Sequence, residues 1–305
     1  MIEKMGEEDI KKRWNIYLYY WTIPVFIVFF IINYFTRNFM IEALNINLMI
    51  SVVSFLFGFL ITITFSMLLN RVSALKDALA IEAGRLVSLY HLSKNLGKEF
   101  HEKITQRIDD YTVNTLRDYT NYDISREAMY GIYSDLQYAQ VEDKKQEGNY
   151  GSFLYILGEF ETLRERLEYL TSRRVEWSLK AAGYMLGSIL MILLFLNRGD
   201  TFSNTLFILL STIIIFIFLI IEDYDNLRIG DYTYNISNSE QIFDLIGKER
   251  YYPKEVLSKA RLIFGETYRI GILDKKTNKE KMVNIKYNPT LKSKIEFLKG
   301  KFKGR

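Results

Sequence analysis

The sequence predicts an all-α membrane protein with four transmembrane helices, long cytoplasmic helical extensions and a small C-terminal β-hairpin. Three observations predict this fold class. Hydrophobic residues make up 49% of the 305-residue chain and gather in four stretches without a charged residue. Between the second and third stretches, apolar side chains recur with helical spacing. Proline occurs only at Pro24, Pro253 and Pro289, so little interrupts a helix before the C-terminal region.

The four uncharged stretches are residues 14–36, 43–70, 181–197 and 201–221. A helix needs about 17–25 mostly apolar residues to cross a bilayer, so each stretch is long enough, the third only just. Between Leu206 and Ile221 the last stretch holds fourteen Leu, Ile or Phe residues, and at roughly −0.5 kcal/mol each they favour insertion by about 7 kcal/mol. The first is too long for a cleaved signal peptide and lacks a small-residue cleavage site. We therefore expect a multi-pass protein of the cell membrane.

Lysine and arginine near the ends of the spans predict the orientation. They are frequent before the first span and on both sides of the long central region, for example at Lys12, Arg71 and Arg174. In the two short connections, between the first and second spans and between the third and fourth, the only lysine or arginine residues are Arg37 and Arg198. Because positive residues favour the cytoplasmic side, both termini and the central region are expected in the cytoplasm.

Four regions are expected along the chain. Residues 1–97 hold the N-terminal segment, the first two spans and the cytoplasmic extension of the second span, which ends at Gly97. Residues 98–178 form a cytoplasmic helical bundle. Residues 179–235 hold the third and fourth spans and an acidic segment. Residues 236–305 form a cytoplasmic C-terminal region with short helices and the hairpin.

Finer expectations concern the bundle and the C-terminal region. Ser125 is expected to cap a helix that runs through Val141, and the polar run at 142–151 is expected to be a loop. The helix after this loop is expected to continue directly into the third span. In the C-terminal region, 252–265 resemble a short helix, and 267–287 alternate as a hairpin does.

Few residues suggest catalysis. The chain has no cysteine and therefore no disulfide or thiolate chemistry, and it lacks a phosphate-binding glycine loop. The run that begins at His101 resembles the start of a zinc-protease motif, but Thr105 stands where the second histidine must be. His91 and His101 are read as surface residues. Because these motifs are missing from the sequence, we expect neither an enzyme nor a cofactor. The net charge of +4 does not suggest a nucleic-acid partner.

The second span has one weakly polar face, which we call the stripe. On a helix that turns about 100° per residue, its members fall within about a third of the circumference. One interpretation is close packing between membrane helices, which small and hydroxyl residues permit. The other is a pore wall, in which two phenylalanine rings form an apolar constriction and hydroxyls solvate a passing ion. Four spans of one subunit enclose too little space for a pore, so the second interpretation requires a ring of subunits. The stripe consists of Ser51, Phe55, Phe59, Thr62, Ser66 and Asn70.

At this point the sequence resembles the bestrophins. The run FLFGFLIT, from Phe55 to Thr62, is similar to the second-span motif of these ion channels, in which Phe-x-x-Gly-Phe leads into a pore neck. Ser51 stands where the neck usually has an apolar residue. The order of two spans, a long helical insert, two spans and a tail also agrees, over about residues 14–240. The run LIIEDYDNLRIGDYTYNIS after the last span resembles the family's acidic segment, although Pro-Phe-Gly is missing.

The resemblance implies an ion channel built as a homo-oligomer, with a pentamer expected. Five copies of the second span would line the path, with Phe55 and Phe59 as its neck. Chloride or a similar anion is the expected ion, although bacterial relatives can prefer cations. The stripe has no charge, so the preference would come from groups such as Arg71, Lys76 or Asp77. The implied partners are the lipid bilayer, further copies of the chain and inorganic ions.

A second hypothesis from a different class stays open. The chain could be a non-conducting, membrane-anchored scaffold or sensor whose bundle and hairpin recruit a cytoplasmic partner, for example by strand addition.

The acidic segment also has two interpretations. In animal bestrophins an acidic cluster after the last span binds calcium, and Glu222, Asp223 and Asp225 could begin an oxygen-ligand site. Their spacing is not that of an EF-hand loop. We expect instead that these carboxylates form the hydrated end of the span, and calcium is not expected.

Overall fold

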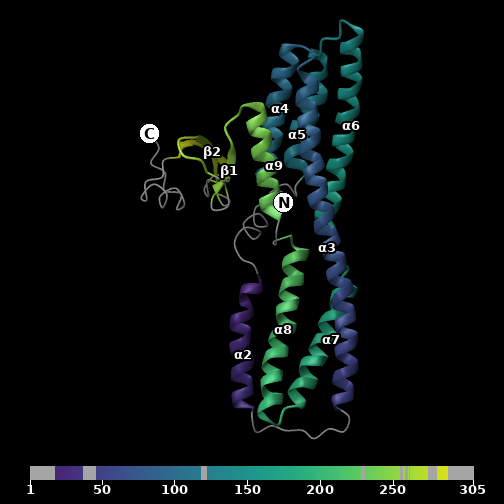
Figure 1. Ribbon diagram of the computed structural model, residues 1–305, viewed down its shortest axis with the longest axis vertical. Coiled ribbons are helices and arrows are strands. Elements are labelled where there is room, and N and C mark those ends of the chain that lie inside the picture. The colour runs from purple at the N-terminus through teal and green to yellow at the C-terminus, as the bar shows by residue number, and fades with distance from the viewer. Residues whose placement is uncertain are drawn as a thin grey trace. The chain divides into compact units, whose positions relative to one another are not determined.

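The computed structural model describes residues 18–36, 46–117, 122–227, 231–254, 257, 260, 262–273 and 280–287. The described chain is mostly helical and includes one small sheet (Figure 1), which confirms the helical class predicted from the sequence. The helices are η1 (Leu18–Trp21), α2 (Thr22–Phe35), α3 (Ile46–Ser93), α4 (Lys98–Arg117), α5 (Tyr122–Asp135), η2 (Leu136–Tyr138), α6 (Lys144–Ser172), α7 (Trp177–Leu196), α8 (Thr201–Asp225) and α9 (Asp231–Ile246). The strands are β1 (Tyr251–Pro253), β2 (Thr267–Leu273) and β3 (Glu280–Lys286).

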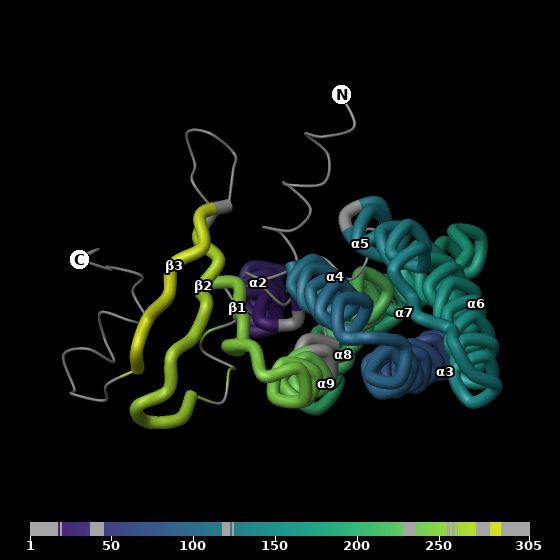
Figure 2. Tube along the Cα trace, turned by 90° about the horizontal axis from the view of Figure 1, so that it is seen from above, coloured from purple at the N-terminus to yellow at the C-terminus, as the bar shows by residue number. Residues whose placement is uncertain are grey.

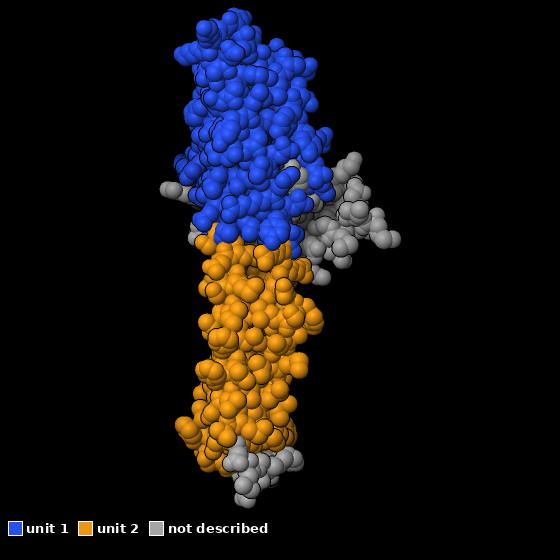
Figure 3. All heavy atoms as spheres, turned by 90° about the vertical axis from the view of Figure 1, so that its right-hand side faces the viewer, with its two compact units in different colours: residues 1–10, 74–172, 230–305 blue, residues 11–73, 173–229 orange. Residues whose placement is uncertain are grey.

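The chain divides into two compact units, which Figure 3 distinguishes by colour. The apolar unit comprises Lys11–Ser73 and Arg173–Ile229. The bundle unit comprises Met1–Ile10, Ala74–Ser172 and Gly230–Arg305. Helix α3 therefore supplies residues to both units.

Three segments of the described chain are long and apolar enough to cross a membrane: Ile46–Ser93, Lys144–Leu196, which includes both α6 and α7, and Thr201–Asp225. The apolar part of the second segment is α7. Three predicted spans are thus confirmed as helices of sufficient length and hydropathy. In the first predicted span, α2 is apolar but has 14 residues, and residues 14–17 lie outside the described chain.

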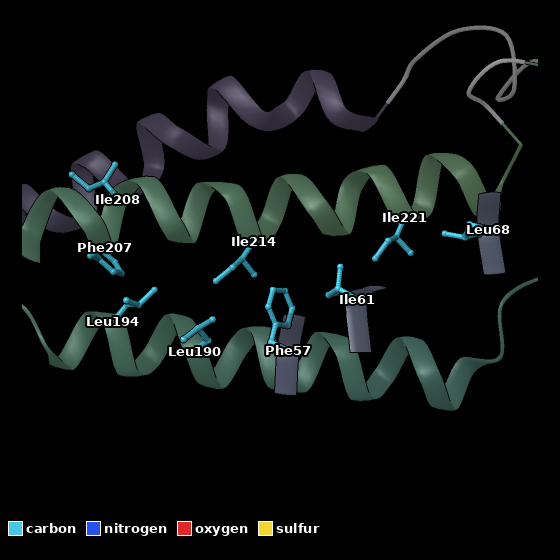
Figure 4. Packing of buried hydrophobic residues seen from close by; sticks show 9 residues of the cluster. All are labelled: Phe57, Ile61, Leu68, Leu190, Leu194, Phe207, Ile208, Ile214 and Ile221. Atoms are coloured by element: carbon cyan, nitrogen blue, oxygen red, sulfur yellow. The ribbon is translucent and has the colours of Figure 1, made fainter. Parts of the chain in front are cut away.

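The core of the apolar unit lies between α3, α7 and α8. Figure 4 shows its buried side chains, most of which point from the three helices toward one another, while Ile208 lies on the side of α8 that faces α2. Helix α2 packs on α8, where the rings of Phe29 and Phe207 meet edge to face at 5.7 Å. The core residues are Phe57, Ile61, Leu68, Leu190, Leu194, Phe207, Ile208, Ile214 and Ile221.

The bundle unit packs the second half of α3 with α4, α5 and α6. Gly97 follows α3 with a φ of 104°, a left-handed conformation that favours glycine, and so allows the chain to turn into α4. The helix itself ends at Ser93, four residues before Gly97. Phe100 of α4 meets Phe153 of α6 with ring centroids 5.2 Å apart, and both side chains are fully buried. Nearby, the buried carboxylate of Glu82 accepts hydrogen bonds from Tyr111 and Arg164.

The sheet confirms the predicted hairpin and adds a third strand. Strands β2 and β3 are antiparallel, while β1 runs parallel to β2, in the order β1-β2-β3 (Figure 2). Arg269 of β2 ties the sheet to α4 through two bonds to Asp109, at 2.6 and 2.7 Å. The short helix expected over 252–265 is wrong at its start, because Tyr252 and Pro253 belong to β1, and several of its later residues lie outside the described chain.

Two further expectations within the bundle are wrong. Residues 144–151 are the first turns of α6 and not a loop, because Asp143 caps the helix by accepting from the backbone N–H of Gln146 at 2.7 Å. Ser125 does not cap a helix that reaches Val141. It is buried inside α5, which begins at Tyr122 and ends at Asp135.

Helix α6 does not continue directly into α7. Residues 173–176 are non-helical, and Glu176 has an extended backbone with a ψ of 133°. The backbone N–H of Val175 donates to the carboxylate of Asp225 at 2.8 Å. This bond replaces the donation that a continuous helix would make, so Asp225 stabilises the interruption.

Candidate functional site

Helix α3 has a buried face within the apolar unit. Phe57, Ile61, Thr64 and Leu68 are each at most 8% exposed and recur at helical spacing. The first, second and fourth of these belong to the core shown in Figure 4. The hydroxyl of Thr64 donates to the carbonyl of Leu60 at 3.0 Å, so this buried polar group is satisfied within the helix.

The stripe lies on the opposite side of α3. Phe55 is 73% exposed and Phe59 is 61% exposed, and the side chains of the other four members are also exposed. On a wheel of about 100° per residue, the middle of the stripe lies roughly 150° from the middle of the buried face. Packing against helices of the same chain therefore does not account for the stripe. It faces a surface that one chain leaves uncovered.

The stripe is weakly polar and uncharged. The Ser51 hydroxyl donates to the carbonyl of Asn47 at 2.9 Å, and the Thr62 hydroxyl donates to that of Gly58 at 2.8 Å. Each hydroxyl oxygen keeps acceptor capacity toward the exterior. The face can therefore contact water at less cost than an all-aliphatic one, but it does not distinguish anions from cations by charge.

Close packing through small residues occurs on α7 instead. A β-carbon on Gly187 would clash with Phe218 and would lie 3.0 Å from Phe57, and one on Gly183 would lie 3.7 Å from Leu60. Two glycines four residues apart in an apolar helix are the usual signal for such a contact. This spacing of Gly183 and Gly187 is visible in the sequence and could have identified the contact.

A buried ionic cluster joins α3, α7 and α8 in the apolar unit. The ammonium of Lys180 lies 2.6 Å from Asp225 and 2.9 Å from Glu222. Arg71 of α3 donates to the carboxylate of Asp225 at 3.4 Å and to its backbone carbonyl at 3.1 Å. Tyr184 and Lys180 both donate to Glu222. We call Arg71, Lys180, Tyr184, Glu222 and Asp225 the ionic cluster.

The cluster corrects two expectations. The acidic segment is not a hydrated helix end, because Asp223 is fully buried and Asp225 is 2% exposed. Arg71 does not offer an uncompensated charge to an ion path, since it is bonded to Asp225. The described residues contain no group of three histidine, cysteine or acidic side chains arranged to hold a metal ion.

The two histidines lie near the end of α3 and near the start of α4. The Nδ1 atom of His101 lies 2.8 Å from the hydroxyl of Ser93, and its ring lies beside Tyr90 at 4.9 Å. Burial, followed by the charge of Lys94, lowers the pKa of His101. These contacts are those of a residue that joins the end of α3 to α4.

The comparisons agree with the resemblance of the second span. A family profile described as a bestrophin-like domain matches residues 23–233, which is well over half of the chain. No curated protein and no solved structure matches the chain. The matched range begins in α2 and continues to the start of α9, and so includes the stripe and the ionic cluster. The chain therefore belongs to the bestrophin-like family.

Proposed function

We propose that this chain is one subunit of an oligomeric ion channel in which the stripe of α3 lines the path of the ion. The observation that carries the proposal is the exposure of Phe55 and Phe59 on the face of α3 opposite to the core. Membership of the bestrophin-like family supports it, because the family is known for channels. Anions such as chloride are the proposed substrate.

The path requires several copies of the chain. Side chains of α3, α7 and α8 fill the interior of the apolar unit, while the stripe lies on its surface. A closed ring of subunits would turn each stripe toward a common axis. We propose five copies, as the family resemblance implies, with both termini in the cytoplasm and α2 as the fourth membrane helix.

The two rings would form the neck. Phe55 and Phe59 lie about one helical turn apart, so each would contribute one apolar ring of side chains to the wall. A narrow apolar constriction empties of water easily and closes the path without a moving lid. Ser51, Thr62, Ser66 and Asn70 would form the wetted wall on either side of the neck.

We propose no metal for the acidic segment. Lys180 is bonded to both Glu222 and Asp225, and Arg71 is bonded to Asp225. These cations balance two of the three carboxylates that a metal would need.

The test is the current that purified protein carries in planar lipid bilayers. Changing both Phe55 and Phe59 to alanine should widen the neck and give a larger unitary conductance or longer openings. The matched control is Phe30→Ala, because Phe30 is also 56% exposed but lies on α2. Equal currents in the double variant and the wild type would contradict the neck.

The mass of the purified particle separates the channel from a scaffold. A ring of five copies with measurable current supports the channel. A monomer or dimer that carries no current would instead favour the membrane-anchored scaffold that recruits a cytoplasmic partner.

A further inference from the structure

One buried cation of the apolar unit is surrounded by neutral acceptors. Arg198 lies between α7 and α8 and is 6% exposed. Its guanidinium donates to the carbonyl of Phe195 at 2.8 Å and to the side-chain oxygen of Asn33 at 3.4 Å. It also donates to the hydroxyl and the carbonyl of Thr36, at 2.8 and 3.3 Å. These oxygens satisfy its N–H groups but do not balance its charge.

No carboxylate of the described chain forms an ion pair with Arg198. Asp200, the nearest acid in the sequence, is exposed, and its carboxylate caps α8 by accepting from the N–H of Ser203 at 2.6 Å. Burial lowers the pKa of Arg198 without an offsetting carboxylate, yet an arginine stays protonated at neutral pH. Arg71 and Lys180, the other described cations of this unit with side chains at most 9% exposed, each have a carboxylate partner.

Arg198 lies at the end of the apolar unit where α3 begins. Phe57 of α3 packs on Gly187 of α7, and the two helices run in opposite directions. Ile46 precedes Phe57 by the same number of residues as Arg198 follows Gly187. Because the two helices run in opposite directions, both residues lie toward the same end of the unit. Figure 1 places the first turns of α3 at the same end as the connection between α7 and α8.

We propose that Arg198 is the residue that gives the channel its preference for small monovalent anions. The inference rests on the proposed function. Arg198 has no counter-ion among the described residues, and such a buried charge acts over a longer distance than a solvated or paired charge, because the surrounding dielectric constant is low. A ring of subunits repeats this charge around the end of the path, and rings of basic residues favour anions. The stripe has no charged residue, so none of its side chains opposes the attraction of anions by Arg198.

The experiment measures the reversal potential of single channels under a potassium chloride gradient. The wild type should reverse close to the chloride equilibrium potential. Arg198→Gln removes the charge and should lower the permeability ratio of chloride to potassium by at least about threefold. Arg198→Lys keeps the charge and should retain the ratio.

Two further variants separate charge from packing and leave Arg198 in place. Asn33→Asp puts a carboxylate beside the guanidinium in nearly the same shape, so it should lower the ratio as Arg198→Gln does. This variant also serves if Arg198→Gln does not fold. Thr36→Val removes a hydrogen bond but no charge, and it should leave the ratio unchanged.

Three results would overturn the inference: a cation-preferring wild type, an unchanged ratio in Asn33→Asp, or a loss of the ratio in Thr36→Val as large as in Asn33→Asp. In each case current still flows, so the proposed channel stands, but a cation-preferring wild type would also reject chloride as its proposed substrate. A wild type that carries no current is a different result, which rejects the channel and this inference together.

Discussion

Gly187 and Gly58 occupy opposite environments in the apolar unit. Gly187 of α7 is buried against Phe57, Ile214 and Phe218, whereas a β-carbon on Gly58 of α3 would meet no atom of the chain within 4 Å. Both are glycines in apolar helices, so local sequence does not separate them. The first permits close contact between helices, and the second lies at the edge of the stripe.

This difference predicts opposite effects of alanine on stability. Gly187→Ala should lower the free energy of unfolding by about 1–3 kcal/mol, because the ring of Phe218 must move to make room. Gly58→Ala adds a methyl group in open space and should raise it by up to about 1 kcal/mol through helix propensity. Unfolding of the purified variants in detergent measures both. Equal destabilisation by the two substitutions would contradict the packing described for α7.

The ionic cluster fixes how three helical elements meet. Asp225 is the last residue of α8, and it accepts bonds from Arg71 of α3, from Lys180 of α7 and from the backbone N–H of Val175. A buried ion pair contributes little net stability compared with an apolar replacement, but loss of one partner leaves a buried charge uncompensated. The end of α8 is therefore a point on which the position of α3 depends.

We expect Asp225→Asn to lower the free energy of unfolding by about 3–5 kcal/mol, because Arg71 and Lys180 lose their shared carboxylate. The matched control is Asp200→Asn at the other end of the same helix, where asparagine caps about as well as aspartate. Chemical unfolding of the two variants in the same detergent gives the comparison. Similar midpoints would mean that the cluster does not hold the helices together.

The sequence predicted elements better than their junctions. The length of α3 and the hairpin followed from periodicity within each segment. The polar run at the start of α6 favours a loop by composition, so it wrongly predicted one there. Asp143 and Gln146 nevertheless have the spacing of a helix cap. The break before α7 had no local signal, since the carboxylate that stabilises it belongs to Asp225, far along the chain.

For the candidate site, too, the sequence predicted features within one helix but not the contacts between helices. Periodicity grouped the six stripe residues on one face of a helix. It did not determine whether that face was buried, because this depends on which side of α3 packs against α7 and α8. The sequence likewise did not predict the neutral surroundings of Arg198 among the described residues, since its acceptors come from both α2 and α7.

At the scale of the whole molecule, the proposed ion path requires an assembly that one chain cannot provide. The core of the apolar unit is closed by Phe57 and its neighbours, while the stripe is left on the outside. A lipid-facing stripe would place hydroxyl and amide groups against acyl chains, which offer them no hydrogen-bond partner. A stripe that faces a water-filled path gives these groups a partner and gives Phe55 and Phe59 a role.

The accessibility of single cysteines to a charged, water-soluble thiol reagent tests this claim most directly, and the chain has no cysteine of its own. Ser66 lies on the stripe, and its neighbour Met67, which is 41% exposed, lies outside it on the same helix. We expect the reagent to modify Ser66→Cys and block its current, and to leave the current of Met67→Cys unchanged. Current through Ser66→Cys that the reagent leaves unaltered, or equal block of both variants, would contradict a water-filled path along the stripe.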